Sequence, residues 1–184
     1  VETANILAEI VDRELQRRQE ELVKVADDPE LPQLIETQSA LPWQKRKALF
    51  KLLQDKKELV DAERRSLSLE PDTSWFLTDA EGKPLFREPF NTETIDENFA
   101  SRDYFHGLGK EFDRNDMPQG ITPIRAPYVS TAFRSNATQR YMVAISVPVW
   151  DQDRRRIVGL LARTIHLDDL RKELNSQMAQ NEDP

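Results

Sequence analysis

The sequence contains no cysteine and only five glycines among its 184 residues. Without cysteine the chain has no disulfide, no thiolate for catalysis and no cysteine-based zinc site. So few glycines leave no glycine-rich loop that could hold a phosphate group, and no serine-elbow or zinc-hydrolase motif is present. We therefore expect neither enzyme activity nor a cofactor.

Histidines and long apolar runs are also scarce. The only two histidines, His106 and His166, lie far apart and lack a carboxylate at ligand spacing, so we predict no metal site. No apolar run approaches the roughly 20 residues that span a bilayer. The formal net charge of −7 disfavours binding to nucleic acid and to anionic membrane surfaces.

What is present in the first third of the chain is helical periodicity. Residues 3–27 carry apolar side chains at helical spacing, with Glu and Arg between them. Further helices are expected at 31–37 and from about Pro42 to Arg65, because proline suits a first helical turn. These helices form an N-terminal segment that we place at 1–69.

Strand patterns dominate from residue 70 onward. A turn containing Gly82, which is free to adopt positive φ, separates the first two strands. The expected strands are 74–78, a return strand from 84, 128–135, 140–150 and 156–167. A short helix before residue 112 and a C-terminal helix at 168–178 complete the pattern. We predict an α+β fold with a five-stranded antiparallel sheet flanked by helices, including a long N-terminal helix. The main domain is placed at 70–178, with a frayed tail at 179–184.

Four segments in this order resemble the Cache superfamily of PAS-like sensor domains. They are the hairpin 75–85 (WFLTDAEGKPL), the segment 98–105 (NFASRDYF), the strand 142–151 (MVAISVPVWD) and the last strand and exit helix at 157–170. The resemblance covers roughly 70–172. It implies the extracytoplasmic, ligand-sensing part of a bacterial membrane receptor, such as a chemoreceptor or a sensor kinase, with membrane helices on either side. The small ligand would lie between the sheet and the loops on its outer face.

Arg102 is the first candidate ligand-binding residue. A guanidinium is always charged and offers a planar fork of donors to a carboxylate, and the resemblance implies that this arginine faces the carboxylate of the ligand. Alternatively, Arg102 braces its loop by bonding to backbone carbonyls or to Asp103. Tyr104 can line the pocket and donate a hydrogen bond from its hydroxyl, or it can pack in the core. For Phe105 we expect packing in the core.

Five further candidates lie on the later strands: Tyr128, Ser130, Ala144, Ser146 and Thr164. Tyr128 and Ser130 are two residues apart and share a face. The resemblance implies carboxylates in place of Ser130 and Thr164 in relatives that bind amino acids. Because both positions carry hydroxyls here, we expect a small carboxylate ligand in preference to an amino acid. The small side chains of Ala144 and Ser146 leave space for a ligand or equally for a packed helix, and all five residues also fit ordinary strands.

The apolar stripe of the first helix, residues 6–23, fits either a core face or the seam of a homodimer. The alternative function is therefore a ligand-free dimerisation or interaction module of a receptor. If the domain is a sensor, ligand binding would change the relative position of the N-terminal and C-terminal helices, provided that the ligand binds two conformations of the domain with different affinity.

Overall fold

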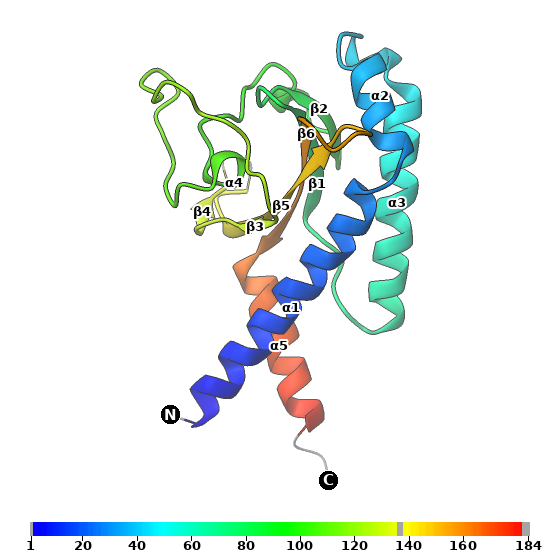
Figure 1. The fold of residues 1–184 in the computed structure, drawn as a ribbon. Helices are drawn as coiled ribbons and strands as arrows, with labels where there is room; N and C mark the ends of the chain where they lie inside the picture. Colours follow the sequence, from blue (N-terminus) through cyan, green and yellow to red (C-terminus); the bar gives the residue numbers. More distant parts are fainter. Residues whose placement is uncertain (1, 136–137, 182–184) are drawn as a thin grey trace.

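An antiparallel six-stranded sheet forms the centre of the structure (Figure 1), a computed structural model that describes residues 2–135 and 138–181. The strands are β1 (Ser74–Asp79), β2 (Pro84–Glu88), β3 (Tyr128–Val129), β4 (Phe133–Arg134), β5 (Tyr141–Trp150) and β6 (Ile157–His166). Their order is β2-β1-β6-β5-β3, and β4 also pairs with β5. The predicted α+β class is confirmed.

Helices lie on one face of the sheet, and a loop-rich layer lies on the other. The helices are α1 (Glu2–Ala26), α2 (Glu30–Gln38), α3 (Lys47–Ser66), α4 (Asp103–His106) and α5 (Leu167–Asn181), with single turns at Trp43–Lys45 and Thr92–Thr94. Figure 1 shows α1 crossing the sheet beside α2 and α3, while α4 and its loops cover the opposite face. The start of α1 and the end of α5 lie at the same end of the molecule, where the two helices cross and then diverge.

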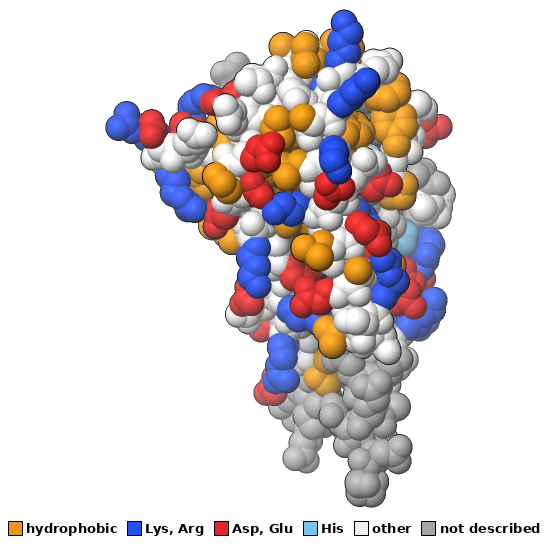
Figure 2. Space-filling model, turned by 90° about the vertical axis from the view of Figure 1, so that its right-hand side faces the viewer, with side chains coloured by type: hydrophobic (Ala, Val, Ile, Leu, Met, Phe, Trp, Pro, Cys, Tyr) orange, Lys and Arg blue, Asp and Glu red, His pale blue; other side chains and the backbone are white. Residues whose placement is uncertain are grey.

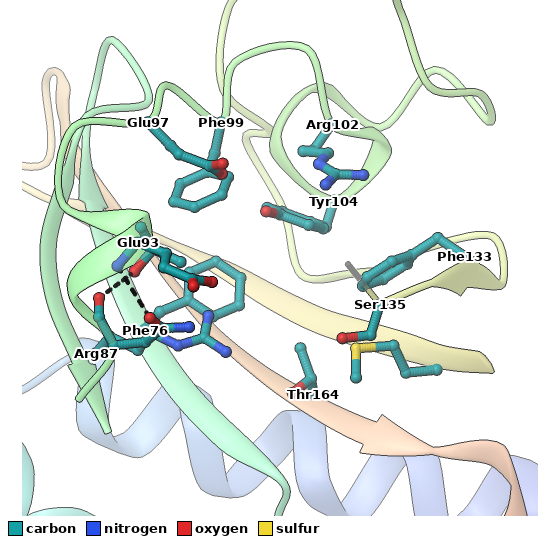
Figure 3. Close-up of a pocket in the computed structure, with 13 residues that line it drawn as sticks. Phe76, Arg87, Glu93, Glu97, Phe99, Arg102, Tyr104, Phe133, Ser135 and Thr164 are labelled. Atoms are coloured by element: carbon teal, nitrogen blue, oxygen red, sulfur yellow. Dashed lines mark hydrogen bonds between the residues drawn. The ribbon is translucent and has the colours of Figure 1, made fainter. Parts of the chain in front are cut away.

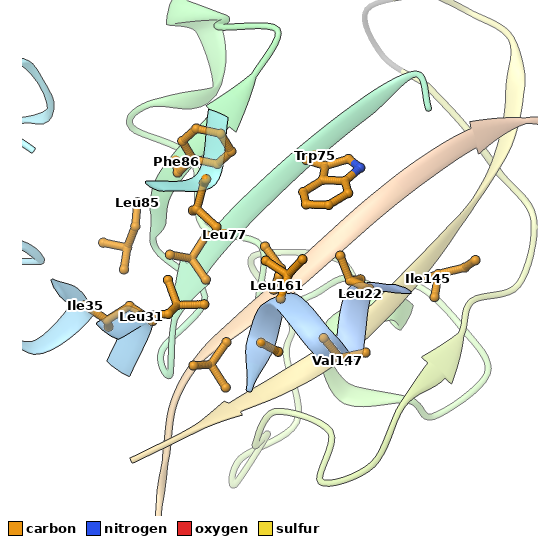
Figure 4. Close-up of a cluster of buried hydrophobic side chains, with 14 of the residues drawn as sticks. Leu22, Leu31, Ile35, Trp75, Leu77, Leu85, Phe86, Ile145, Val147 and Leu161 are labelled. Atoms are coloured by element: carbon orange, nitrogen blue, oxygen red, sulfur yellow. The ribbon is translucent and has the colours of Figure 1, made fainter. Parts of the chain in front are cut away.

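The helical face of the sheet contains the main core. Leu22 of α1 is fully buried against Trp75 of β1, Ile145 of β5 and Leu161 of β6 (Figure 4). The other apolar residues of the α1 stripe whose side chains the structure describes pack against the same cluster: Ile10, Val11, Leu15 and Val23. Val25 and Ala26, which follow the stripe, belong to the cluster as well. Over these residues the stripe is therefore a core face, and homodimerisation through this helix stays a prediction. Ile6 and Leu7 lie outside the described side chains.

The opposite face of the sheet has a smaller apolar cluster. Phe76, Ala144, Leu160 and Ala162 project from the strands toward Phe105 of α4. Strand β5 thus buries both faces, with Ile145, Val147 and Val149 under α1 and its even-numbered residues on the outer side. This agrees with the predicted division of 140–150 into two faces.

The sheet has six strands because the predicted strand 128–135 is interrupted. Thr131, between β3 and β4, donates its backbone N–H and its hydroxyl to Asp103 of α4, at 2.7 and 2.9 Å. These bonds interrupt the pairing with β5 after Ser130, whose backbone N–H still donates to the Ala144 carbonyl at 2.9 Å. Helix α4 is also shorter than predicted, because Gly107 takes a left-handed conformation (φ 69°) and ends it after one turn.

A network of buried charges joins α1, α3, α5 and the start of β1. The carboxylate of Asp72 is fully buried, accepts from Arg18 Nη1 at 2.6 Å and from Trp75 Nε1 at 2.7 Å, and pairs with Arg163. Arg18 also donates to Glu173 of α5 at 2.6 Å. Because the two terminal helices share these bonds, the network fixes α1 against α5.

The outer surface of the helical layer is strongly charged. Figure 2 shows acidic and basic side chains interspersed on the α3 side of the molecule, where pairs such as Lys51–Asp55 lie one helical turn apart. Within the two described stretches of chain, no helix is long and apolar enough to cross a bilayer. Of the predicted frayed tail, 179–181 continue α5, and 182–184 lie outside the described residues.

Candidate functional site

A cavity of about 100 Å³, open to solvent, lies between the outer face of the sheet and the loop-rich layer (Figure 3). The strands provide its floor, and the segment 91–104 provides its rim. Its lining combines aromatic rings, two cations, two carboxylates and several neutral polar groups: Phe76, Arg87, Asn91, Glu93, Thr94, Glu97, Phe99, Arg102, Tyr104, Phe133, Ser135, Met142 and Thr164. Ring surface with a few polar groups is the usual composition of a small-molecule site.

The hairpin between β1 and β2 positions the rim of the cavity. Gly82 has φ +85°, and a Cβ atom there would lie 2.6 Å from the backbone nitrogen of Ala100. The backbone N–H of Phe99 donates to the carbonyl of Gly82 at 2.8 Å. Because only glycine permits this approach, the turn holds the segment that leads to Arg102 against the sheet.

Asp103 fixes the other side of the rim. Its fully buried side chain accepts from the backbone N–H of Gly109 at 2.6 Å and from the Tyr128 hydroxyl at 3.2 Å, in addition to the two bonds from Thr131. One carboxylate therefore joins α4 to the loop after it and to the β3–β4 connection.

Arg102 lines the cavity as predicted, but its charge is already paired. Its Nη1 donates to Glu111 Oε2 at 2.9 Å, its guanidinium carbon lies 5.9 Å from the centre of the Phe133 ring, and its side chain is 19% exposed. Burial opposes the charged form, yet Tyr104 and Glu111 raise the pKa of Arg102 above its ordinary value. The expected brace to Asp103 or to backbone carbonyls is replaced by this ion pair.

Tyr104 and Thr164 also line the cavity. The ring of Tyr104 packs edge-on against Phe76, with ring centres 5.1 Å apart, while its hydroxyl makes no hydrogen bond with any residue in 2–135 or 138–181. Burial raises the pKa of Tyr104 far above its usual range, so the hydroxyl remains a donor. The Thr164 hydroxyl shares a 2.7 Å hydrogen bond with Ser74 at the floor.

The other four candidates do not line this cavity: Tyr128, Ser130, Ala144 and Ser146. Tyr128 bonds to Asp103, and Ser130 accepts from the backbone N–H of Ala144 at 3.0 Å. Ser146 donates to the backbone carbonyl of Tyr104 at 2.7 Å. Each of these three hydroxyls bonds within the protein, and Ala144 packs in the smaller apolar cluster. All four residues therefore support the structure around the cavity without facing it.

Sequence reasoning missed three charged residues of the cavity: Arg87, Glu93 and Glu97. Arg87 lies opposite Phe76 in the β1–β2 pairing and so shares its outer face. Extending the alternation of β2 beyond residue 86 would have indicated this position. Glu93 and Glu97 belong to an irregular segment whose side-chain directions no periodicity predicts.

No family model and no curated protein matches the chain, whereas several solved structures do. The ligand-binding domain of the Pseudomonas aeruginosa PAO1 amino acid chemoreceptor PctC, in complex with GABA, is 17% identical, with a TM-score of 0.50 over 96% of this chain and 69% of that chain. That of the Pseudomonas fluorescens chemoreceptor CtaA, in complex with L-alanine, is 12% identical, with a TM-score of 0.58 over 92% and 59% of the chains. The chain has the Cache-type fold of these sensor domains.

A third structure with the Cache-type fold is the ligand-binding domain of the amino acid chemoreceptor PctB of Pseudomonas aeruginosa PAO1, in complex with L-Arg. It is 13% identical, with a TM-score of 0.52 over 94% of this chain and 58% of that chain. This chain therefore spans about 59% of the length of the CtaA structure and less than two thirds of the PctB structure.

The preference for a carboxylate over an amino acid is wrong, since domains of this Cache-type fold are solved in complex with GABA, L-alanine and L-Arg. That preference rested on the hydroxyls of Ser130 and Thr164, which stand where the resemblance implies carboxylates. That argument did not include Glu93 and Glu97, which line the cavity from the rim.

Proposed function

We propose that the chain is the extracytoplasmic sensor domain of a bacterial membrane receptor and that its cavity binds a small amino acid. The observation that carries this proposal is the lining of the cavity, which places Arg87 and Arg102 near Glu93 and Glu97. An amino acid carries one carboxylate and one ammonium group, so a site with both signs of charge suits both ends of the ligand. Ring surface from Phe76 supports the apolar part.

The residues that would contact the ligand include Arg102, Tyr104 and Thr164. Tyr104 supports this assignment because its hydroxyl is a donor beside the cavity without a partner among the described residues, and a ligand acceptor would satisfy it. Arg102 keeps donors beyond the one that bonds to Glu111. The chemistry needed here is recognition, and no reaction is assigned to the domain.

The arrangement of the helices is compatible with signalling. The start of α1 and the end of α5 lie at the same end of the molecule (Figure 1), and the buried charge network joins the two helices further along, where Arg18 donates to Glu173. A ligand that draws the rim toward the sheet would change the packing of α1 on the opposite face of the same strands. In a membrane receptor, these two helices would transmit that change.

A ligand screen tests the proposal. Titration with GABA, L-alanine and L-arginine should raise the melting temperature, since a ligand at 100 times its Kd adds about 2.7 kcal/mol, or about 5–10 °C for a chain of this size. A flat response to a full panel of amino acids would refute amino-acid sensing and would favour the ligand-free interaction module.

A single hydroxyl tests the location of the site. Tyr104→Phe should weaken binding of a confirmed ligand by about 2- to 12-fold, the value of one neutral hydrogen bond, with little change in melting temperature. Tyr141→Phe is the matched control, because Tyr141 is 62% exposed and does not line the cavity. Equal calorimetric Kd values for both variants would place the ligand elsewhere.

A further inference from the structure

The two arginines of the cavity differ in their partners. Arg102 is paired with Glu111, as described above. The side chain of Arg87 makes no hydrogen bond and no ion pair with any residue that the structure describes, and its Nε atom is buried without a partner. Figure 3 shows Arg87 on the β2 side of the cavity, across from Arg102.

The two carboxylates of the cavity differ in the same way. Glu97 accepts from Arg114 Nη2 at 2.9 Å, and this ion pair neutralises its charge. The side chain of Glu93 has no hydrogen-bond or ion-pair partner in the described part of the chain. Its position is nevertheless defined, because the Glu93 N–H donates to Asn91 Oδ1 at 2.9 Å in the turn Thr92–Thr94.

The electrostatics of Arg87 agree with an uncompensated charge. Burial lowers the pKa of Arg87 below its ordinary value, and the nearby Tyr104 and Glu97 only partly oppose this effect. The pKa of Arg102, which has its own carboxylate, shifts in the opposite direction. A partly buried guanidinium without a carboxylate is costly unless another anion pairs with it.

We propose that Arg87, and not the motif residue Arg102, is the principal anchor for the carboxylate of the ligand, and that Glu93 binds its ammonium group. The ligand class is then a small zwitterion that needs both charges. This inference rests on the proposed function and adds to it the two residues that select the ligand. Arg102 contacts the ligand as a secondary donor whose charge Glu111 has already balanced.

Isothermal titration of the whole domain with GABA and L-alanine tests the inference. Arg87→Gln should weaken binding of the better of these ligands by about 10- to 100-fold, because a hydrogen-bonded charge is lost, and Glu93→Gln by about 10-fold or more. Arg102→Gln should weaken it by less than about 10-fold, and Arg154→Gln, at an exposed arginine far along the chain, should leave it unchanged.

Ligand analogues give a second measurement that does not depend on the folding of a variant. Butyrate lacks the ammonium group of GABA, and butylamine lacks its carboxylate, so the unmodified domain should bind both at least about 10-fold more weakly. The advantage of GABA over butyrate should shrink in Glu93→Gln, and the advantage over butylamine should shrink in Arg87→Gln.

The outcomes separate the two proposals. If the unmodified domain binds neither amino acid nor any other of a full panel, the proposed function and this inference both fail. If it binds an amino acid, but Arg87→Gln retains its Kd within about threefold while Arg102→Gln loses more, the inference fails and the sensing function stands.

Discussion

Replacing Asp72 by asparagine tests the buried charge network, which holds α1 and α5 together. Asp72 has a fully buried carboxylate that meets Arg18, Arg163 and Trp75. Asparagine keeps the shape but removes the charge, so two buried guanidinium groups lose their shared partner. Breaking a buried ion pair from one side costs about 3–5 kcal/mol, which corresponds to a melting temperature lower by about 6–20 °C for a chain of this size.

Thermal and urea unfolding followed by circular dichroism measure this loss. Asp55→Asn is the control, because Asp55 is 63% exposed and pairs with the exposed Lys51, and the melting temperature of this variant should change by about 2 °C or less. Burial opposes the charge on Asp72, but Arg163 and Arg18 outweigh it and lower the pKa of Asp72. The advantage of the unmodified protein should therefore be complete above about pH 4 and should vanish as the pH falls through that lowered pKa. Equal losses in the two variants at neutral pH would refute the network as a source of stability.

Three further substitutions probe other parts of the structure. Glu173→Gln should gain stability relative to the unmodified protein as the pH rises from about 4 through the pKa of Glu173, because burial and the nearby Glu14 outweigh the pairing with Arg18 and raise that pKa; parallel urea midpoints of the two proteins would contradict the reasoning. Gly82→Ala should destabilise the chain by at least about 1 kcal/mol, since its φ is +85° and the new Cβ would meet the backbone of Ala100 at 2.6 Å; an unchanged melting temperature would show that the turn relaxes freely. Asp103→Asn should release the β3–β4 connection, because an amide cannot accept all the bonds that Thr131 and its neighbours donate; faster hydrogen exchange at Thr131 would confirm this, and unchanged exchange would exclude it.

The sequence by itself determined the elements with strong local patterns. Helical spacing in 3–27 and alternation in 140–150 predicted α1 and β5, because these periods follow from backbone geometry alone. The same alternation assigned the two faces of β5 correctly. Arg102 and Tyr104 were placed beside a cavity through the resemblance of their segment, which is also local.

Only the tertiary structure decided which charges are free. Arg102 and Arg87 are both arginines near short elements, and nothing in the sequence indicates that Glu111 neutralises one while the other remains unpaired. The division of 128–135 into β3 and β4 likewise depends on Asp103, more than twenty residues earlier in the chain. Pairing and burial of charge depend on distances between segments that are remote in sequence, and local periodicity carries no information about those distances.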